Sequence, residues 1–321
     1  GVQTCALPIF ELASICLAKG QRAVVGRVAM DDPGQCPDYY RDASAEASVT
    51  ETRTFIAELR ALPGNGGLVL PAVTPRFIPT CSDAALIGLG RLTDEMSCHV
   101  QTHCSESDWE DAYVLKRTGR RDADALDRFG LLTRRTVLAH GVLMNDEDFA
   151  YLAKAGAAVA HCPLSNVYFG DAVFPVRRAI DRGVRVGLGT DIAGGPSASI
   201  FEACRSAVAA SRLLEHGADP AHPAAARGRG DSRIDFREAL WLATAAGGEA
   251  LNLPIGRFAK DYAFDAMVID ANAPGSDLKI WPELDEPDDI AQKIVNEATR
   301  ANVTRVWVDG KLVRNAPTGF S

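Results

Sequence analysis

The stretch Gln101-Thr102-His103-Cys104-Ser105-Glu106 closes an apolar run with a histidine and adds a glutamate three residues later. Three later apolar runs also close with a residue that can bind a metal ion or move a proton. They end in Leu138-Ala139-His140-Gly141, Ala160-His161-Cys162-Pro163 and Gly187-Leu188-Gly189-Thr190-Asp191. Polar residues at the ends of four successive apolar runs are difficult to explain by packing alone, and this repetition decides the fold.

Around these stretches, apolar runs of strand length alternate with amphipathic stretches of helix length. This alternation predicts βαβ units and a parallel sheet that is buried on both faces. The predicted strands span 23–30, 68–74, 98–103, 136–140, 157–161 and 184–189, and helices are predicted at 47–62, 82–96, 146–155 and 172–182. Six such strands favour an α/β barrel of the (β/α)8 type whose first two strands are missing. A doubly wound dinucleotide-binding sheet is disfavoured because no G-x-G-x-x-G follows a strand.

In such a barrel the carboxyl ends of the strands meet at one catalytic face. His103, His140, His161 and Asp191 each stand at such an end. We therefore expect these four side chains to lie close together in space.

The segment after Asp191 continues as a helix at 199–214, a loop rich in Ala, Gly, Pro and Arg at 215–232, and a helix at 236–250. From residue 254 the pattern changes to short β-strands at 264–270 and 303–313. The second of these contains an Asp-Gly turn signal. The chain therefore divides near residue 253 into a large α/β part and a small β part.

The composition is that of an ordinary globular protein, with 321 residues, 47% hydrophobic and 24% charged. A net charge of -8 and the lack of a Lys/Arg stripe argue against nucleic acid as a partner. No apolar run approaches the roughly 18 residues of a membrane span. Eight cysteines are scattered without a C-x-x-C pair, which favours reduced thiols in the cytoplasm.

Residues 1–9 differ from the rest of the chain. They contain no initiator Met and neither the basic region nor the long apolar region of a signal peptide. They resemble a translated sequencing adapter. We expect the native sequence to begin near Phe10.

Five short landmarks, in order and at domain-scale spacing, resemble the guanine deaminases of the amidohydrolase superfamily. The resemblance covers residues 10 to the C-terminus. It implies a partial metal-dependent hydrolase barrel at 10–253 and the C-terminal half of a small β-sandwich at 254–321. The landmarks are Thr74-Pro75-Arg76-Phe77, His103-Cys104-Ser105-Glu106, Ala139-His140-Gly141, His161-Cys162-Pro163-Leu164-Ser165-Asn166 and Gly189-Thr190-Asp191-Ile192-Ala193-Gly194-Gly195.

The resemblance implies one Zn²⁺ ion per subunit, with His103 and Asp191 as ligands. For His140 it implies either a metal contact or a hydrogen bond that orients the attacking hydroxide. His161 either lines the pocket or has a structural role. Neutral imidazole suits zinc, although a His/Asp set accepts other divalent ions.

Glu106, His140 and Asp191 are the predicted catalytic residues. A metal ion lowers the pKa of its bound water from 15.7 to about 7, and Glu106 can take that proton and deliver it to the substrate. The alternative is structural: Glu106 as an acidic residue at a helix start and Asp191 as a helix N-cap.

Arg76 and Phe77 are predicted to bind the substrate, together with His103 and Glu106. The guanidinium offers a fork of donors that matches the two acceptors O6 and N7 of guanine. The Phe77 ring can stack on the purine face. The alternative is a surface arginine and a core phenylalanine.

Other metal-binding side chains are expected to stay outside the site. Cys104 and Cys162 follow His103 and His161 directly, and neighbours on a strand point to opposite faces. His99, His216 and His222 have no motif around them.

The family also needs a His-x-His pair on its first barrel strand, and no histidine precedes His99. Two ligands, even with His140 nearby, should hold zinc weakly because catalytic zinc normally has three protein ligands and a water. We therefore expect this chain to be an N-terminally truncated deaminase that is inactive or nearly so.

The implied reaction is hydrolytic deamination of guanine to xanthine and ammonia by a homodimer. One alternative is an amidohydrolase that acts on another purine, a pyrimidine or a triazine. The other is a non-catalytic homologue that acts as a partner-binding scaffold.

Overall fold

The computed structural model describes residues 6–170 and 172–315 of the chain. Of the predicted leader 1–9, residues 1–5 thus lie outside the described residues, whereas residues 6–9 open helix α1 (Ala6–Ala18). The start of the native sequence near Phe10 stays a prediction.

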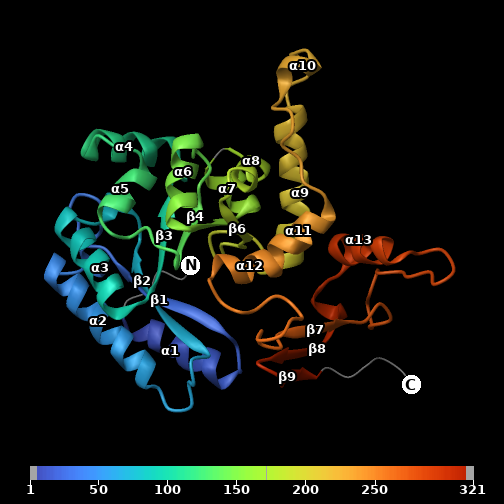
Figure 1. Ribbon diagram of the computed structural model, residues 1–321, viewed down its shortest axis with the longest axis horizontal. Helices are drawn as coiled ribbons and strands as arrows, with labels where there is room; N and C mark the ends of the chain where they lie inside the picture. The colour runs from blue at the N-terminus through green and yellow to red at the C-terminus, as the bar shows by residue number, and fades with distance from the viewer. Residues whose placement is uncertain (1–5, 171, 316–321) are drawn as a thin grey trace.

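The centre of the molecule is a parallel sheet in which each strand pairs with the next one along the chain (Figure 1). All six predicted strands are confirmed, with ends that differ from the prediction by at most one residue. They were predictable because most of them are short, largely apolar runs that alternate with stretches of helix length. The strands are β1 (Ala23–Ala29), β2 (Val69–Pro75), β3 (His99–Cys104), β4 (Thr136–His140), β5 (Ala158–His161) and β6 (Arg185–Leu188).

Helices connect the strands and lie around the periphery of the sheet in Figure 1. Most begin at a Ser or Asn whose side chain accepts a hydrogen bond from the first helical turn. The helices are α2 (Ala45–Ala61), α3 (Asp83–Met96), α4 (Asp108–Thr118), α5 (Asp122–Arg128), α6 (Asp146–Ala155), α7 (Pro163–Phe169) and α8 (Val176–Asp181), with short 3-10 turns η1 (Asp38–Tyr40) and η2 (Ile78–Thr80).

After β6 the chain forms a helical layer that packs against the last strands. Helix α9 (Ile200–His216) extends upward in Figure 1 into an arm that carries α10 (Ala224–Arg227) within the predicted loop. The single helix predicted at 236–250 is divided into α11 (Phe236–Ala243) and α12 (Ala245–Ala250), because Thr244 has φ -125° and ψ -92°.

The C-terminal part is an antiparallel sheet of β7 (Ala266–Ile269), β8 (Val303–Val308) and β9 (Lys311–Asn315). The Asp309-Gly310 turn joins β8 to β9, as the sequence predicts. Two elements were not predicted, helix α13 (Pro287–Glu297) and the turn η3 (Arg300–Asn302). The Arg205 guanidinium joins the two parts, since it donates to the carbonyls of Val295 and Asn296 at the end of α13.

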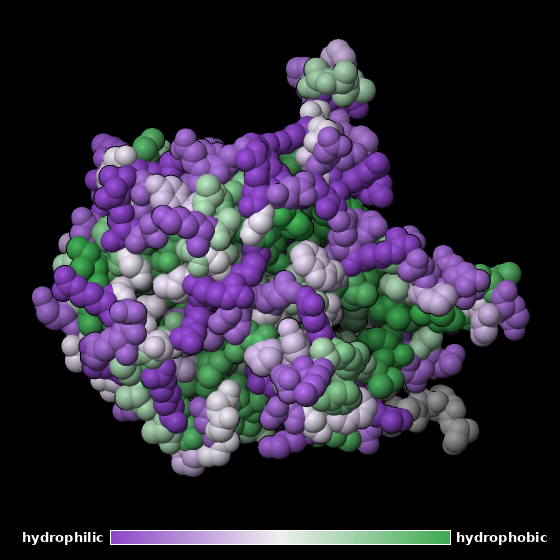
Figure 2. Space-filling view, viewed as in Figure 1, coloured by the Kyte–Doolittle hydropathy of each residue, from purple (hydrophilic) through white to green (hydrophobic). Residues whose placement is uncertain are grey.

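The apolar core lies between the parallel sheet and its helices, and its largest fully buried side chains include Phe55, Phe149 and Phe174. Figure 2 shows apolar surface in the hollow between α12 and the small sheet. A cavity of about 870 Å³ is found there, lined among others by Leu240, Met267 and Trp307. None of the described helices has the length and apolar character needed to cross a membrane.

Candidate metal and active site

Three residues at the carboxyl ends of the sheet have a left-handed backbone that non-glycine residues rarely adopt. Ser105 has φ 49°, His140 has φ 75° and Asp191 has φ 51°. Such conformations cost on the order of 1–3 kcal/mol each and cluster at functional sites. Three of the non-glycine residues with a left-handed backbone therefore lie at the face that the sequence predicts.

A pocket of about 200 Å³ opens at this face. It brings together five of the predicted site residues, and it adds Phe169 and Gly194, which the sequence did not single out. The predicted residues in its lining are Arg76, Phe77, His103, Glu106 and Asp191.

His103, the last residue but one of β3, is held by its Nδ1 atom. That nitrogen lies 2.8 Å from the carbonyl oxygen of Arg76, which also accepts the backbone N–H of His103 at 3.0 Å. A carbonyl can only accept, so Nδ1 carries the proton and Nε2 keeps its lone pair. Metal-binding histidines are oriented in this way by an acceptor on the other ring nitrogen.

His140 ends β4 and is held in the same manner. Its Nδ1 lies 3.0 Å from Oδ1 of Asn166, a residue of helix α7. Its Nε2 is buried and forms no hydrogen bond within the described residues. An unpartnered buried acceptor is costly in a folded protein. A bound cation at Nε2 would remove that cost.

Glu106 completes this group. Its Oε1 lies 3.6 Å from His140 Nε2. One ligand atom from each of His103, Glu106 and His140 lies within 4.8 Å of the other two. The rings of His103 and His140 are stacked with centroids 5.2 Å apart. Two lone-pair nitrogens and a carboxylate are a donor set that divalent transition metals bind, so the residues fit a metal ion.

Burial keeps the imidazole of His103 neutral. Removal from water lowers its pKa, and the neighbouring His140 ring lowers it further. A neutral ring is the form that ligates metals.

Asp191 follows β6 and lines the same pocket. Its Oδ2 accepts a hydrogen bond of 2.6 Å from the Ser165 hydroxyl. The structure thus brings Asp191 to the pocket, but the metal-competent group among the described residues consists of His103, Glu106 and His140. The role of Asp191 as a ligand stays a prediction.

Neither His140 nor His161 is among the residues that line this pocket. Nδ1 of His161 is 3.4 Å from Nδ2 of Asn166, and its ring lies 5.3 Å from that of Phe174. Burial, with repulsion from His140, lowers its pKa to about 3. This neutral histidine supports Asn166, which in turn supports His140.

Arg76 and Phe77 follow β2 and form one wall of the pocket. The Arg76 guanidinium carbon lies 5.0 Å from the centre of the Phe77 ring, an attractive cation–π arrangement. Phe77 is 6.3 Å from the His103 ring and 6.2 Å from that of Trp109, whose side chain is half exposed. The wall therefore offers a fork of donors beside an aromatic face.

The side chains predicted to be incidental lie outside this group. Cys104 is fully buried, and burial raises the pKa of Cys162 to about 12. His99 Nε2 contacts the carbonyl oxygen of Leu251 at 2.7 Å. His216 and His222 have exposed side chains and weak contacts with nearby carboxylates.

Sequence reasoning missed residues that support the site, among them Asn166 and Glu110. Asn166 stands in a landmark that was noticed, but its contact with His140 depends on how α7 follows β5. Glu110 is buried on α4, where the other buried residue is Val114, one turn away. A carboxylate on the apolar stripe of a helix is the signal that could have found it.

The chain belongs to the amidohydrolase family: the model of the Amidohydrolase family matches residues 3–313. It is 35% identical over 308 residues to a probable guanine deaminase of Schizosaccharomyces pombe, covering 94% of this chain and 56% of that protein. It is 33% identical to the guanine deaminase of Mus musculus, covering 94% of this chain and 65% of that protein.

Among solved structures, a guanine deaminase from C. acetobutylicum with bound guanine in its active site superimposes with a TM-score of 0.81 and 28% identity. The match covers 95% of this chain and 68% of that chain. The expected amidohydrolase barrel is thereby confirmed as the fold. The chain spans 56% and 65% of the length of the two curated relatives it matches.

Proposed function

We propose that the protein carrying this chain hydrolyses guanine to xanthine and ammonia. The observation that carries the proposal is the convergence of His103 Nε2, His140 Nε2 and the Glu106 carboxylate beside Arg76 and Phe77. The similarity to guanine deaminases along 94% of the chain supports this choice of substrate.

His103 and His140 would hold a zinc ion, together with Glu106 or Asp191. A bound divalent ion supplies a water of lowered pKa near neutral pH. The carbonyl of Arg76 and the amide of Asn166 hold the two imidazoles in the ligating tautomer. Other divalent ions fit the same donors, and metal analysis of the purified protein identifies the one present.

Glu106 moves the protons. Its carboxylate takes one proton from the attacking water and gives it to the purine ring nitrogen while the water oxygen bonds to C2. It then takes the proton of the new C2 hydroxyl and gives it to the exocyclic amine, so that the bond from C2 to the exocyclic nitrogen breaks, C2=O forms and ammonia leaves. Proton transfer by a positioned group contributes roughly 10²–10⁴-fold to a rate.

Arg76 orients the base and Phe77 excludes water from one face of it. The guanidinium fork matches the acceptors O6 and N7 of guanine, a pairing worth about 1–3 kcal/mol. In the active protein, Arg76→Ala should lower kcat/KM for guanine by roughly 10- to 100-fold. Arg91→Ala, an exposed arginine on α3, is the control and should leave it unchanged. Unchanged kinetics in Arg76→Ala would remove Arg76 from the substrate site.

This chain by itself is expected to turn over little or no guanine. Its six histidines include no His-x-His pair, and a catalytic zinc normally has three protein ligands. An assay of the purified chain at saturating zinc tests this, and robust guanine turnover would refute it.

The decisive assay uses the product of the complete locus, loaded with zinc, and a panel of guanine, adenine, a pyrimidine and a triazine. Xanthine and ammonia in equal amounts, with guanine preferred, are expected. Glu106→Gln should lower kcat by about 10²–10⁴-fold. Preference for another heterocycle, or no turnover at all, would overturn the proposal.

We also propose a cytoplasmic homodimer. The described cysteines are all free thiols, which supports a reducing compartment. Sedimentation analysis of the protein tests the dimer, and fractionation of the source cells tests the compartment.

A further inference from the structure

Two buried carboxyl groups lie directly behind the turn that carries Glu106. Glu110 on α4 is 1% exposed, and Asp122 at the start of α5 is fully buried. Neither forms an ion pair with an arginine or lysine in the part of the chain that the structure describes. Buried carboxylates without a cation are expensive, so their retention here calls for a role.

Each carboxyl group holds one backbone N–H of the turn. Asp122 Oδ2 accepts the N–H of Ser105 at 2.8 Å, and Glu110 Oε2 accepts the N–H of Glu106 at 2.8 Å. The two N–H groups are consecutive, and Ser105 between β3 and Glu106 has the left-handed φ of 49°. The carboxyl groups thus fasten a strained turn at two adjacent points.

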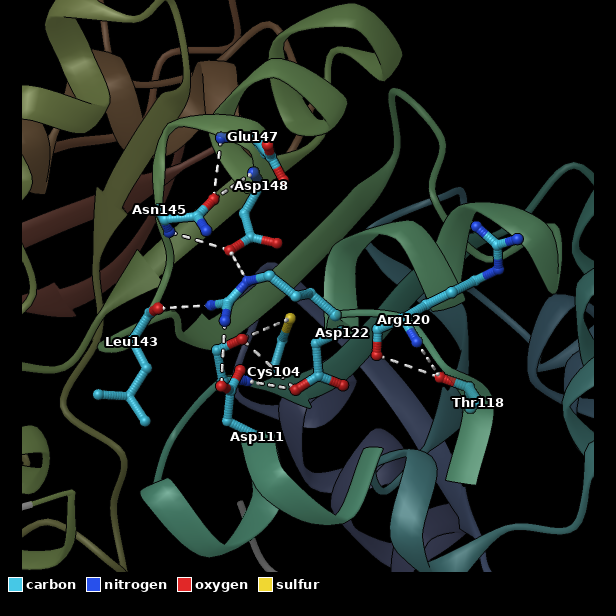
Figure 3. Close-up of polar contacts among 11 residues, drawn as sticks. Cys104, Asp111, Thr118, Arg120, Asp122, Leu143, Asn145, Glu147 and Asp148 are labelled. Carbon is cyan, nitrogen blue, oxygen red and sulfur yellow. Dashed lines mark hydrogen bonds and ion pairs between the residues drawn. The ribbon is translucent and has the colours of Figure 1, made fainter. Parts of the chain in front are cut away.

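The carbonyl side of the same turn is also held. Leu143 N–H donates to the Ser105 carbonyl at 3.1 Å, and Gly141 N–H donates to that of Cys104 at 2.9 Å. Arg121 packs the surrounding elements together by contacts with Asp111, Leu143 and Asp148, the residues grouped in Figure 3. Hydrogen bonds therefore hold the turn through its carbonyl groups as well as through its N–H groups.

The direction in which Glu106 points depends on this turn. Ser105 directly precedes Glu106, so its left-handed backbone helps to set the direction of the Glu106 side chain, whose Oε1 lies 3.6 Å from His140 Nε2. A displacement of 1 Å at a reacting group can cost on the order of 10²-fold in rate. We propose that Glu110 and Asp122 are positioning residues, which aim the Glu106 carboxylate at the metal and substrate by holding the backbone of Ser105 and Glu106.

The contact itself does not require a charge. A backbone N–H needs an acceptor oxygen, and a carboxyl or an amide side chain at position 110 supplies one.

Two kinds of variant distinguish the effect of losing the acceptor oxygen from the effect of losing the negative charge. Glu110→Gln keeps an acceptor oxygen and loses the charge. Glu110→Met keeps the volume and loses the acceptor, while Glu110→Asp withdraws the oxygen by one methylene and keeps the charge. Glu58→Ala, an exposed glutamate on α2, is the matched control.

The first readout is the rate of hydrogen exchange of the Ser105 and Glu106 backbone amides in this 321-residue chain, without metal or substrate. Exchange is expected to be at least tenfold faster in Glu110→Met and Glu110→Asp, and unchanged in Glu110→Gln and Glu58→Ala. If Glu110→Met does not fold, the exchange rates of Glu110→Asp are compared with those of the parent instead. Unchanged exchange in a folded loss variant, or equal acceleration in Glu110→Gln, would overturn the proposal.

The second readout is kinetic and rests on the proposed guanine deamination. In the active protein, kcat should fall by roughly 10- to 100-fold in Glu110→Asp while KM for guanine stays within twofold, and Glu110→Gln should retain the parent kcat. Loss of kcat in Glu110→Gln, or a change confined to KM, would contradict it. If no guanine turnover exists, only the proposed function fails, since the exchange readout needs no activity.

Discussion

Strand β3 carries a histidine at each end, and the two have opposite surroundings. His99 at the amino end is buried, and its Nε2 is satisfied by the Leu251 carbonyl at 2.7 Å. His103 at the carboxyl end has its Nδ1 satisfied by the Arg76 carbonyl, and its Nε2 faces Glu106 and His140. Residues four apart on a strand point to the same face, so side-chain direction does not distinguish them.

The difference lies in what the second ring nitrogen meets. Burial lowers the pKa of both histidines, so both rings are neutral donors and acceptors. At the amino end, the His99 ring connects the sheet to the end of α12 and has only a structural role. At the carboxyl end, a carbonyl holds Nδ1 of His103, and Nε2 of His103 lies near the metal-binding atoms of Glu106 and His140. His103 differs from His99 in that its free ring nitrogen lies beside the other metal-binding atoms, those of Glu106 and His140.

The largest expected effect is the difference in zinc affinity between variants at the two ends of strand β3. In zinc titrations against a chelator, His103→Ala should weaken zinc binding by more than about 100-fold, since even loss of an outer partner costs 10–100-fold. His99→Ala should leave the affinity within about threefold of the parent. Equal losses in both variants would mean that the two ends do not differ.

The next effect concerns the residue that orients His140. Asn166→Leu removes the acceptor of the His140 Nδ1 proton, so the ring can adopt the other tautomer or rotate. Zinc affinity should fall by about 10- to 100-fold while the fold persists, as judged by circular dichroism. Asn296→Leu, an exposed asparagine on α13, is the matched control. An unaltered affinity in Asn166→Leu would show that this contact is not needed.

A smaller effect follows from the buried neutral His161. Its pKa is about 3 in the folded protein against an ordinary value of 6.5, so between these values the unfolded chain binds more protons. The free energy of unfolding therefore falls as pH drops through 6.5 towards 3, by up to about 1.4 kcal/mol per pH unit.

Urea unfolding at pH 7 and pH 5 measures this. His161→Phe should lose about 1–2 kcal/mol less than the parent between the two pH values. His216→Gln, at an exposed histidine, should lose as much as the parent. The same loss in His161→Phe as in the parent would mean that His161 is protonated in the fold.

The smallest expected effect concerns His99, the histidine at the amino end of β3. His99→Phe removes one hydrogen bond to Leu251 and should lower the free energy of unfolding by about 0.5–1.5 kcal/mol. Zinc affinity should not change. A loss of affinity with no loss of stability would assign His99 to the site instead.

The sequence predicts the six parallel strands of the fold and several of the residues that meet at the site. The six strands could be found because short apolar runs alternate with stretches of helix length. His103 and Asp191 were found at the ends of such runs, and Arg76, Phe77 and Glu106 stand in the landmarks that resemble guanine deaminases. Their meeting in one pocket follows from the parallel order of the strands.

The contacts of the supporting residues depend on the tertiary fold. Glu110 and Asp122 reach the Glu106 turn from two different helices, and Asn166 reaches His140 across 26 residues of sequence. Helix α13 carries a local signal that the sequence analysis did not use, since Pro287 stands in its first turn and Glu286 and Asp289 form a capping box. The division at Thr244 has no clear local signal, since the segment lacks proline there.

The most direct test of the account is the position of zinc in a crystal of the zinc-loaded protein, located by anomalous scattering at the zinc edge. We expect one strong peak bonded to Nε2 of His103 and Nε2 of His140, beside the carboxylate of Glu106. A peak elsewhere with these nitrogens unliganded, or no peak at saturating zinc, would contradict the assignment of this face as a metal-dependent active site.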